Sequence, residues 1–153
     1  MFAVIRTRGS IGVNRDIRDA LKMMRLNRVN HLVLLPKNES VKGTLKKVEP
    51  FVTYGEIDEQ TLIELIENRA RIAKNKNLSV EFFKKSPCKS AKDIAKAIIE
   101  GKNSCIKIGI KPVFRLHPPK KGFERGGIKK SYRNGGVSGY RAQDINALIR
   151  KMI

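Results

Sequence analysis

The spacing of apolar residues in the N-terminal third of the chain predicts alternating strands and helices. Apolar runs at 1–6, 31–35 and 51–56 predict strands, because each run is short and is bounded by turn or breaker residues. Between these runs, apolar positions recur at helical spacing over 15–24 and 40–48. This order of elements predicts an α/β (α+β) layer in which helices cover one face of a small three-stranded sheet. The other face must be covered by the rest of the chain or by a partner.

The pattern changes at Asp58, which lies where it can cap a long helix with apolar positions from Leu62 to Ala73. Further along, Ser90 and Asp93 have the spacing of a capping box, with Asp in place of the usual Glu. A second helix is therefore predicted to begin there.

Residues 109–141 combine many glycines, prolines and bases, and we expect them to be irregular. A short strand is expected before this segment, at 105–108, and an amphipathic helix after it, at 145–152. We therefore predict a core domain at residues 1–58 and a C-terminal helical extension at 59–153 that contains the basic glycine-rich segment.

Charge narrows the choice of partner. The chain has 33 Lys and Arg against 14 Asp and Glu, a formal net charge of +19, and a small folded chain repels itself strongly at that charge unless a polyanion neutralises it. No stretch reaches the roughly 18 apolar residues that a membrane span needs, and the N-terminus has no signal-peptide pattern. A membrane-surface protein would concentrate its bases on one amphipathic helix, whereas here they run through the whole chain. Nucleic acid is the favoured partner.

The basic segment contains the chemistry that nucleic-acid binding needs. Glycine lets a backbone approach closely, bases pair with phosphates, and aromatic rings stack on unpaired bases. The alternative is a disordered basic loop, and both can hold because such segments commonly order on binding. This composition does not distinguish RNA from DNA. The candidates here are Lys111, Arg115, His117, Lys120, Lys121, Arg125, Lys129, Lys130, Tyr132, Arg133, Tyr140 and Arg141.

A second group of candidates lies near the N-terminus and consists almost entirely of arginines. Arginine favours bidentate contact with phosphate over a role in solubility alone. The alternative is a solvated helix face, because Arg15 and Arg18 lie beside Asp16 and Asp19. The candidates in this group are Arg6, Arg8, Arg15, Arg25, Arg28 and His31.

Nothing in the sequence indicates an enzyme. The Gly-rich stretches match neither GxxxxGK[ST] nor GxGxxG, and neither histidine lies near a Ser or Cys in a recognisable nucleophile motif. The two cysteines, Cys88 and Cys105, are isolated, and we expect reduced packing residues rather than a zinc site or a disulfide. No catalytic residue, metal, cofactor or small-molecule substrate is predicted.

Several stretches carry a family resemblance. In the N-terminal third these are RTRGS at 6–10, DIRDALKMM at 16–24, RVNH at 28–31 and VKGTLKKV at 41–48. Further stretches lie in the tail, at 114–119 (FRLHPP), 127–129, 135–136 and 144–146. Together they resemble the large-subunit ribosomal protein family L30 (universal name uL30, eukaryotic counterpart L7) over nearly the whole chain. The long basic N-terminal region typical of eukaryotic members is missing, so the chain looks like the archaeal type with a C-terminal extension.

The resemblance implies a ferredoxin-like two-layer core and a structural role in the large (50S) ribosomal subunit of the cytoplasm. It implies attachment to 23S-type rRNA near 5S rRNA, with other large-subunit ribosomal proteins as neighbours. The family's core RNA contacts map position by position onto Arg6, Arg8, Arg28 and His31, and the family has no catalytic residues. One alternative is a transient rRNA-binding assembly factor or RNA chaperone. Another is a small nucleic-acid enzyme, but it would need a cluster of acids for metal that the sequence lacks.

Overall fold

The structure is a computed structural model that describes residues 1–72, 76, 90–100, 105 and 108–153. The environment of Cys88 lies outside these residues. The long helix expected to reach Ala73 ends at Arg69, because the backbone of Ala70 is already extended. The strand expected at 105–108 is described only at its two ends, Cys105 and Ile108, and both lie in turns.

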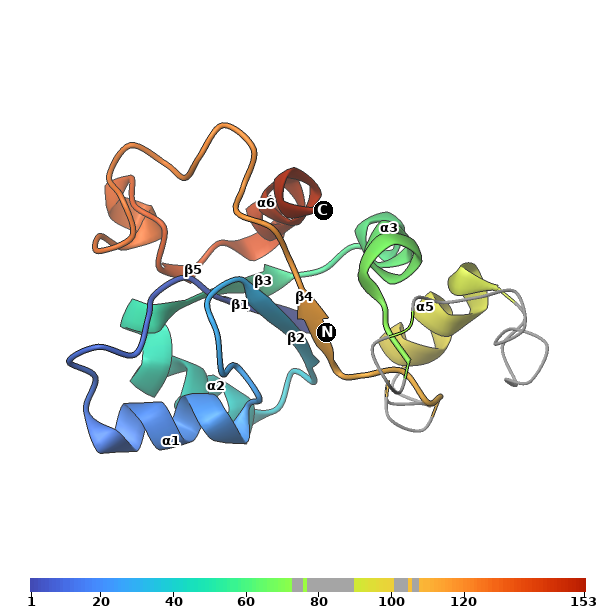
Figure 1. The fold of residues 1–153 in the computed structure, drawn as a ribbon, viewed down its shortest axis with the longest axis horizontal. Coiled ribbons are helices and arrows are strands. Elements are labelled where there is room, and N and C mark those ends of the chain that lie inside the picture. The colour runs from blue at the N-terminus through green and yellow to red at the C-terminus, as the bar shows by residue number, and fades with distance from the viewer. Residues whose placement is uncertain (73–75, 77–89, 101–104, 106–107) are drawn as a thin grey trace.

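The centre of the molecule is one five-stranded sheet with the strand order β4-β2-β1-β3-β5 (Figure 1). Strand β1 pairs antiparallel with both β2 and β3, β4 is antiparallel to β2, and β5 is parallel to β3. The strands are β1 at Phe2–Arg6, β2 at His31–Leu35, β3 at Val52–Glu56, β4 at Val113–Arg115 and β5 at Gly139–Tyr140. The three predicted strands are confirmed, but the prediction of a three-stranded sheet is wrong. The two added edge strands come from the segment expected to be irregular, and they are too short to show a period in the sequence.

Two helices cover one face of the sheet: α1 at Arg15–Met23 and α2 at Glu39–Val48 (Figure 1). Side chains alternate along β1, so Phe2 and Val4 point toward this layer. They pack there against residues such as Leu21 and Leu45, which are almost fully buried. The first half of the predicted architecture, helices on one face of the sheet, is confirmed.

The C-terminal part of the chain covers the opposite face, with α3 at Glu59–Arg69 and α6 at Ile145–Met152, while α5 at Ala91–Ile99 packs against α3 beside the sheet (Figure 1). The alternate residues of β1, Ala3 and Ile5, join a second core cluster that includes Leu65 of α3, Ile94 of α5 and Ile149 of α6. The second face is therefore covered by the chain itself rather than left for a partner.

Of the two helix caps predicted from the sequence, one forms its side-chain hydrogen bonds and the other does not. The capping box of α5 is present, because the Ser90 side chain accepts a hydrogen bond from the backbone N–H of Lys92 and Asp93 accepts one from the backbone of Ser90. Asp58 is the N-cap residue of α3 but makes no side-chain cap bond; its own N–H donates to the side chain of Asn146 at 3.0 Å. Short 3-10 helices lie at Glu49–Phe51, Tyr132–Asn134 and Ala142–Asp144.

The tail approaches the sheet closely at Gly55. A Cβ atom at this position would lie 2.0 Å from the carbonyl oxygen of Ala142, so only glycine allows the two backbones to meet. One residue earlier, the backbone N–H of Arg141 donates to the carbonyl of Tyr54 at 2.9 Å.

The element order of the first 56 residues is β-α-β-α-β, whereas the ferredoxin-like fold has β-α-β-β-α-β. The two share a layer of helices on a sheet.

Candidate nucleic-acid interface

Topology brings several predicted arginines to one end of the sheet. Strand β1 ends at Arg6, β2 begins at His31 and β4 ends at Arg115. Because β1–β2 and β2–β4 are antiparallel pairs, these three ends meet, with His31 directly opposite Arg115. Arg8 and Arg28 lie in the loops that follow β1 and precede β2. We call these five residues the basic end of the sheet.

Arg6 lies inside the protein, with 4% of its surface exposed. Its guanidinium donates hydrogen bonds to the carbonyls of Arg8 and Leu26, at 2.8 and 2.7 Å, and to the Ser10 hydroxyl at 2.7 Å. Burial lowers the pKa of Arg6, and among the described residues no carboxylate forms an ion pair with it. Arg6 therefore fastens the loop after β1 to the turn before β2, while its charge is left uncompensated.

The turn before β2 has a defined backbone. Arg25 and Asn30 both adopt left-handed conformations, with φ of 61° and 62°. The N–H of Asn30 donates to the carbonyl of Arg6 at 2.8 Å, and the Asn30 carbonyl accepts from Leu116 at 3.0 Å. The turn is thus tied to β1 on one side and to the chain after β4 on the other.

His31 lies at the centre of the basic end of the sheet and is half-buried. Burial lowers its pKa, and the charges of Arg115, Arg28 and Arg6 lower it further. Its Nδ1 atom and the Oδ1 atom of Asn30 are buried without a hydrogen-bond partner among the described residues. A neutral imidazole surrounded by cations leaves this end of the sheet attractive to an anion.

The other predicted arginines of this region lie on the surface. Arg25, Arg28 and Arg115 are exposed. Arg8 is partly exposed, and its guanidinium lies 4.9 Å from the centre of the Phe51 ring. Arg15 is exposed on α1 and lies 3.8 Å from Asp19, which agrees with the solvated-face alternative for this residue.

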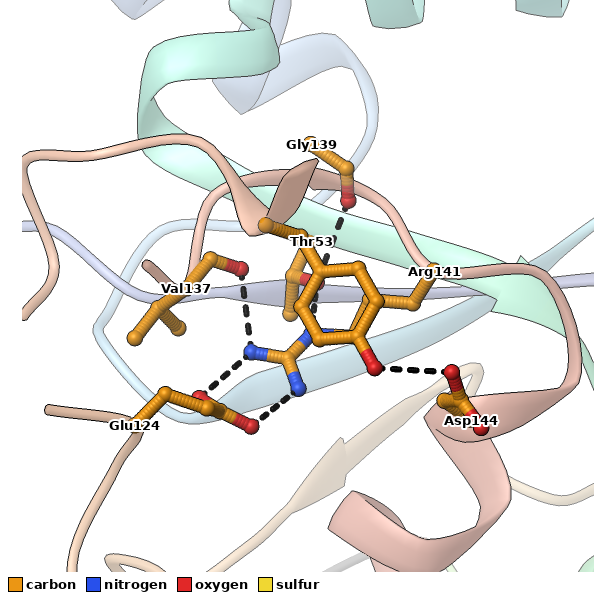
Figure 2. Close-up of polar contacts among 7 residues, drawn as sticks. Thr53, Glu124, Val137, Gly139, Arg141 and Asp144 are labelled. Carbon is orange, nitrogen blue, oxygen red and sulfur yellow. Dashed lines mark hydrogen bonds and ion pairs between the residues drawn. The ribbon is translucent and has the colours of Figure 1, made fainter. Parts of the chain in front are cut away.

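Arg141, predicted as an RNA contact, is instead the centre of a buried cluster, with 2% of its side chain exposed. Figure 2 shows its guanidinium paired with both oxygens of Glu124 and bonded to the carbonyl of Val137 at 3.1 Å. Its Nε donates to the Thr53 hydroxyl at 2.8 Å, and the guanidinium lies 4.4 Å from the centre of the Tyr132 ring. We call these five residues the Arg141 cluster. It joins the tail to β3.

The remaining bases of the tail lie on the surface of a segment that is anchored by its backbone. The N–H groups of His117 and Lys120 donate to the carbonyls of Met152 and Lys151 in α6, at 3.0 and 2.9 Å. Lys111 is half-buried. The exposed residues are His117, Lys120, Lys121, Arg125, Lys129, Lys130 and Arg133.

The two predicted tyrosines are held by their hydroxyl groups. Tyr132 donates to Asp144 at 2.7 Å, and Tyr140 donates to Glu56 at 2.8 Å. These hydrogen bonds raise the pKa of both tyrosines. The ring of Tyr140 lies 5.5 Å from that of Tyr54, centre to centre. The sequence predicts Tyr54 only as part of the strand at 51–56, and no sequence signal links it to residues more than 70 positions away.

The described residues offer little for other functions. They contain no group of three or more His, Cys, Asp and Glu that could hold a metal ion. None of the helices they form has the length and apolar character to cross a membrane. Cys105 is free and buried, and burial raises the pKa of its thiol to about 11.

Comparison with known proteins identifies the family. Residues 2–52 match the family described as ribosomal protein L30p/L7e. The chain is 50% identical to large ribosomal subunit protein uL30 of Methanococcus vannielii over 152 residues, which cover 99% of each chain. It is 53% identical to uL30 of Thermoplasma acidophilum, over all of this chain and 93% of that one. It is 46% identical to uL30 of Nanoarchaeum equitans, over all of this chain and 99% of that one.

These relatives are archaeal and span the tail as well as the core, as the resemblance implied. All carry the name of a structural ribosomal protein, and the family is not known to be enzymatic. The chain belongs to the uL30 family of large-ribosomal-subunit proteins.

Proposed function

We propose that this protein is a structural constituent of the large ribosomal subunit in the cytoplasm, where it binds 23S-type rRNA near 5S rRNA beside other large-subunit proteins. The observation that carries the proposal is the basic end of the sheet. There, exposed arginines surround a buried arginine and a histidine, and no carboxylate in the part of the chain that the structure describes pairs with the buried cation. An rRNA phosphate would supply the missing negative charge.

The candidates divide by position into contacts and supports. Arg28 and Arg115 are exposed at the basic end of the sheet and are suited to phosphate contact, together with the exposed bases of the tail. Arg6 and Arg141 donate their hydrogen bonds within the protein and hold the loops that carry the exposed bases. Residues 1–58 form the two-layer core, which the resemblance describes as ferredoxin-like, and this core serves as the rigid scaffold. Residues 59–153 form the extension.

The physical role is electrostatic. Bases replace the counterions of packed RNA helices, so affinity falls as salt rises. If about ten phosphates are contacted, the log–log slope of affinity against salt should be about −7 to −9.

The test reverses one exposed charge. Arg28→Glu should weaken binding to a large-subunit rRNA fragment in a filter assay and reduce the steepness of the salt dependence by about 1 to 2. The core should stay folded, because Arg28 is exposed. Arg150→Glu is the matched control, since Arg150 is also exposed but lies on α6 beside Glu64. Equal binding by Arg28→Glu and the parent chain would count against the proposal.

Sedimentation distinguishes a resident protein from a transient assembly factor or RNA chaperone. A structural constituent remains with purified large subunits through a high-salt wash, whereas a transient factor is released. Loss of the protein from washed subunits, with rRNA affinity intact, would favour the transient role.

A further inference from the structure

All three tyrosines of the chain line one groove, although they are far apart in the sequence. Tyr54 comes from β3, while Tyr132 and Tyr140 come from the tail. The groove has a volume of about 510 Å³, within the range of about 300 to 1,000 Å³ that is usual for small-molecule sites. Because β5 pairs with β3, the fold itself brings the aromatic rings together.

The rings are held in fixed positions. The hydroxyl groups of Tyr132 and Tyr140 are bonded to Asp144 and Glu56. The guanidinium of Arg141 lies over the ring of Tyr132, 4.4 Å from its centre. Tyr140 is 38% exposed, so part of its ring is open to solvent. An aromatic surface that is already ordered loses little entropy when a flat ligand stacks on it.

The polar groups of the groove complement a nucleotide. Lys46 and Arg133 supply positive charge for a phosphate, and both are exposed. Glu49 supplies an acceptor for the amino group of a base. Tyr54 supplies a hydroxyl that has no hydrogen-bond partner among the described residues.

We propose that this groove binds one unpaired nucleotide of RNA. Its base stacks on the tyrosine rings, its phosphate lies beside Lys46 and Arg133, and its amino group donates to Glu49. This inference rests on the proposed function and names the ligand of one part of the surface. A base-paired helix is excluded from the groove because its bases are already stacked and their edges are paired.

The experiment uses the full chain labelled with ¹³C in its tyrosine rings, which gives signals from the groove alone because every tyrosine lies there. The probes are an eight-nucleotide cytidylate and an abasic ribose-phosphate octamer of the same length and charge. We expect the cytidylate to shift the ring signals upfield by stacking, and the abasic octamer to bind without that shift.

Tyr140→Leu should weaken cytidylate binding about 5- to 150-fold, the measured value of one base–aromatic stack, and leave affinity for the abasic octamer within about twofold. Tyr140→Phe is the control, because it keeps the ring and removes only the hydroxyl bond to Glu56. Equal ring shifts with both probes, or unchanged cytidylate affinity in Tyr140→Leu, would overturn the groove assignment while leaving the proposed function standing. If neither probe bound at low ionic strength, both proposals would fail.

Discussion

The basic end of the sheet and the Arg141 cluster each contain a buried arginine that holds a loop, but within the described part of the chain only the arginine of the Arg141 cluster has a carboxylate partner. In each, a buried arginine donates to backbone carbonyls and fastens a loop, Arg6 at one site and Arg141 at the other. Arg141 has a carboxylate partner in Glu124, and this pairing lowers the pKa of Glu124. Arg6 has no such partner among the described residues.

Because of this difference, the Arg141 cluster only holds a loop in place, whereas the basic end of the sheet also keeps a net positive charge. At the Arg141 cluster the ion pair cancels the field of the buried cation, so that the cluster acts as an internal joint between the tail and β3. At the basic end of the sheet the field of Arg6 adds to those of Arg28 and Arg115, and the histidine among them feels all three. We therefore expect the charge of buried Arg6 to strengthen rRNA binding without direct contact with the RNA.

The largest expected effect comes from breaking the Arg141 ion pair. Glu124→Gln leaves a buried guanidinium without its carboxylate and should lower the free energy of unfolding by about 3 to 5 kcal/mol. Denaturant unfolding measures this change. Combining Arg141→Met with Glu124→Leu should recover part of the loss, because an apolar pair leaves no uncompensated charge. A double variant less stable than Glu124→Gln would contradict the view of the cluster as an ion-paired joint.

Replacing Arg6 should have a smaller effect on stability and a distinct effect on binding. Arg6→Met leaves the carbonyl of Leu26 without its donor and should cost about 1 to 3 kcal/mol in denaturant unfolding. Affinity for rRNA should also fall, although Arg6 is buried, because its uncompensated charge is lost. The tail variant Arg141→Met with Glu124→Leu serves as the comparison, since it removes no net charge. If both variants bound rRNA equally well, the proposed difference between the two sites would be wrong.

The smallest expected effect is electrostatic and is read at His31. Folding lowers the pKa of His31 from its ordinary value of 6.5. At a pH between the folded pKa and 6.5, the unfolded chain therefore binds more protons than the folded chain. His31 therefore contributes stability that is present above about pH 6.5 and is lost as the pH falls toward the folded pKa. Arg28→Met should raise the pKa of His31, measured by NMR titration of its ring. Arg150→Met should leave it unchanged, and an equal response to both would rule out a local field.

The helices and strands that could be predicted from sequence are those with a regular spacing of apolar residues or with helix-capping residues at their start. The strand at 31–35 matches its predicted bounds, and the capping box at Ser90 marks the start of α5. Strands β4 and β5 have three and two residues, too few to show alternation, and exist because longer strands offer them an edge. The sequence predicted Arg6 and Arg141 as RNA contacts, and nothing in the sequence shows that both are buried. Their inward positions depend on carbonyls and a carboxylate brought close only by folding.

The pairing of the edge strands also bears on how the sheet is completed as the chain is made. Strand β2 pairs with residues 113–115, and β3 with residues 139–140, so both partners leave the translating ribosome long after the strands they protect. Until then, the nascent chain holds three strands with two open edges and an apolar face that still lacks α6, a combination prone to non-native association. The part of the chain made before β4, residues 1–112, already holds 23 Lys and Arg against 12 Asp and Glu, a net charge of +11. Mutual repulsion between copies therefore opposes that association before the basic tail is complete.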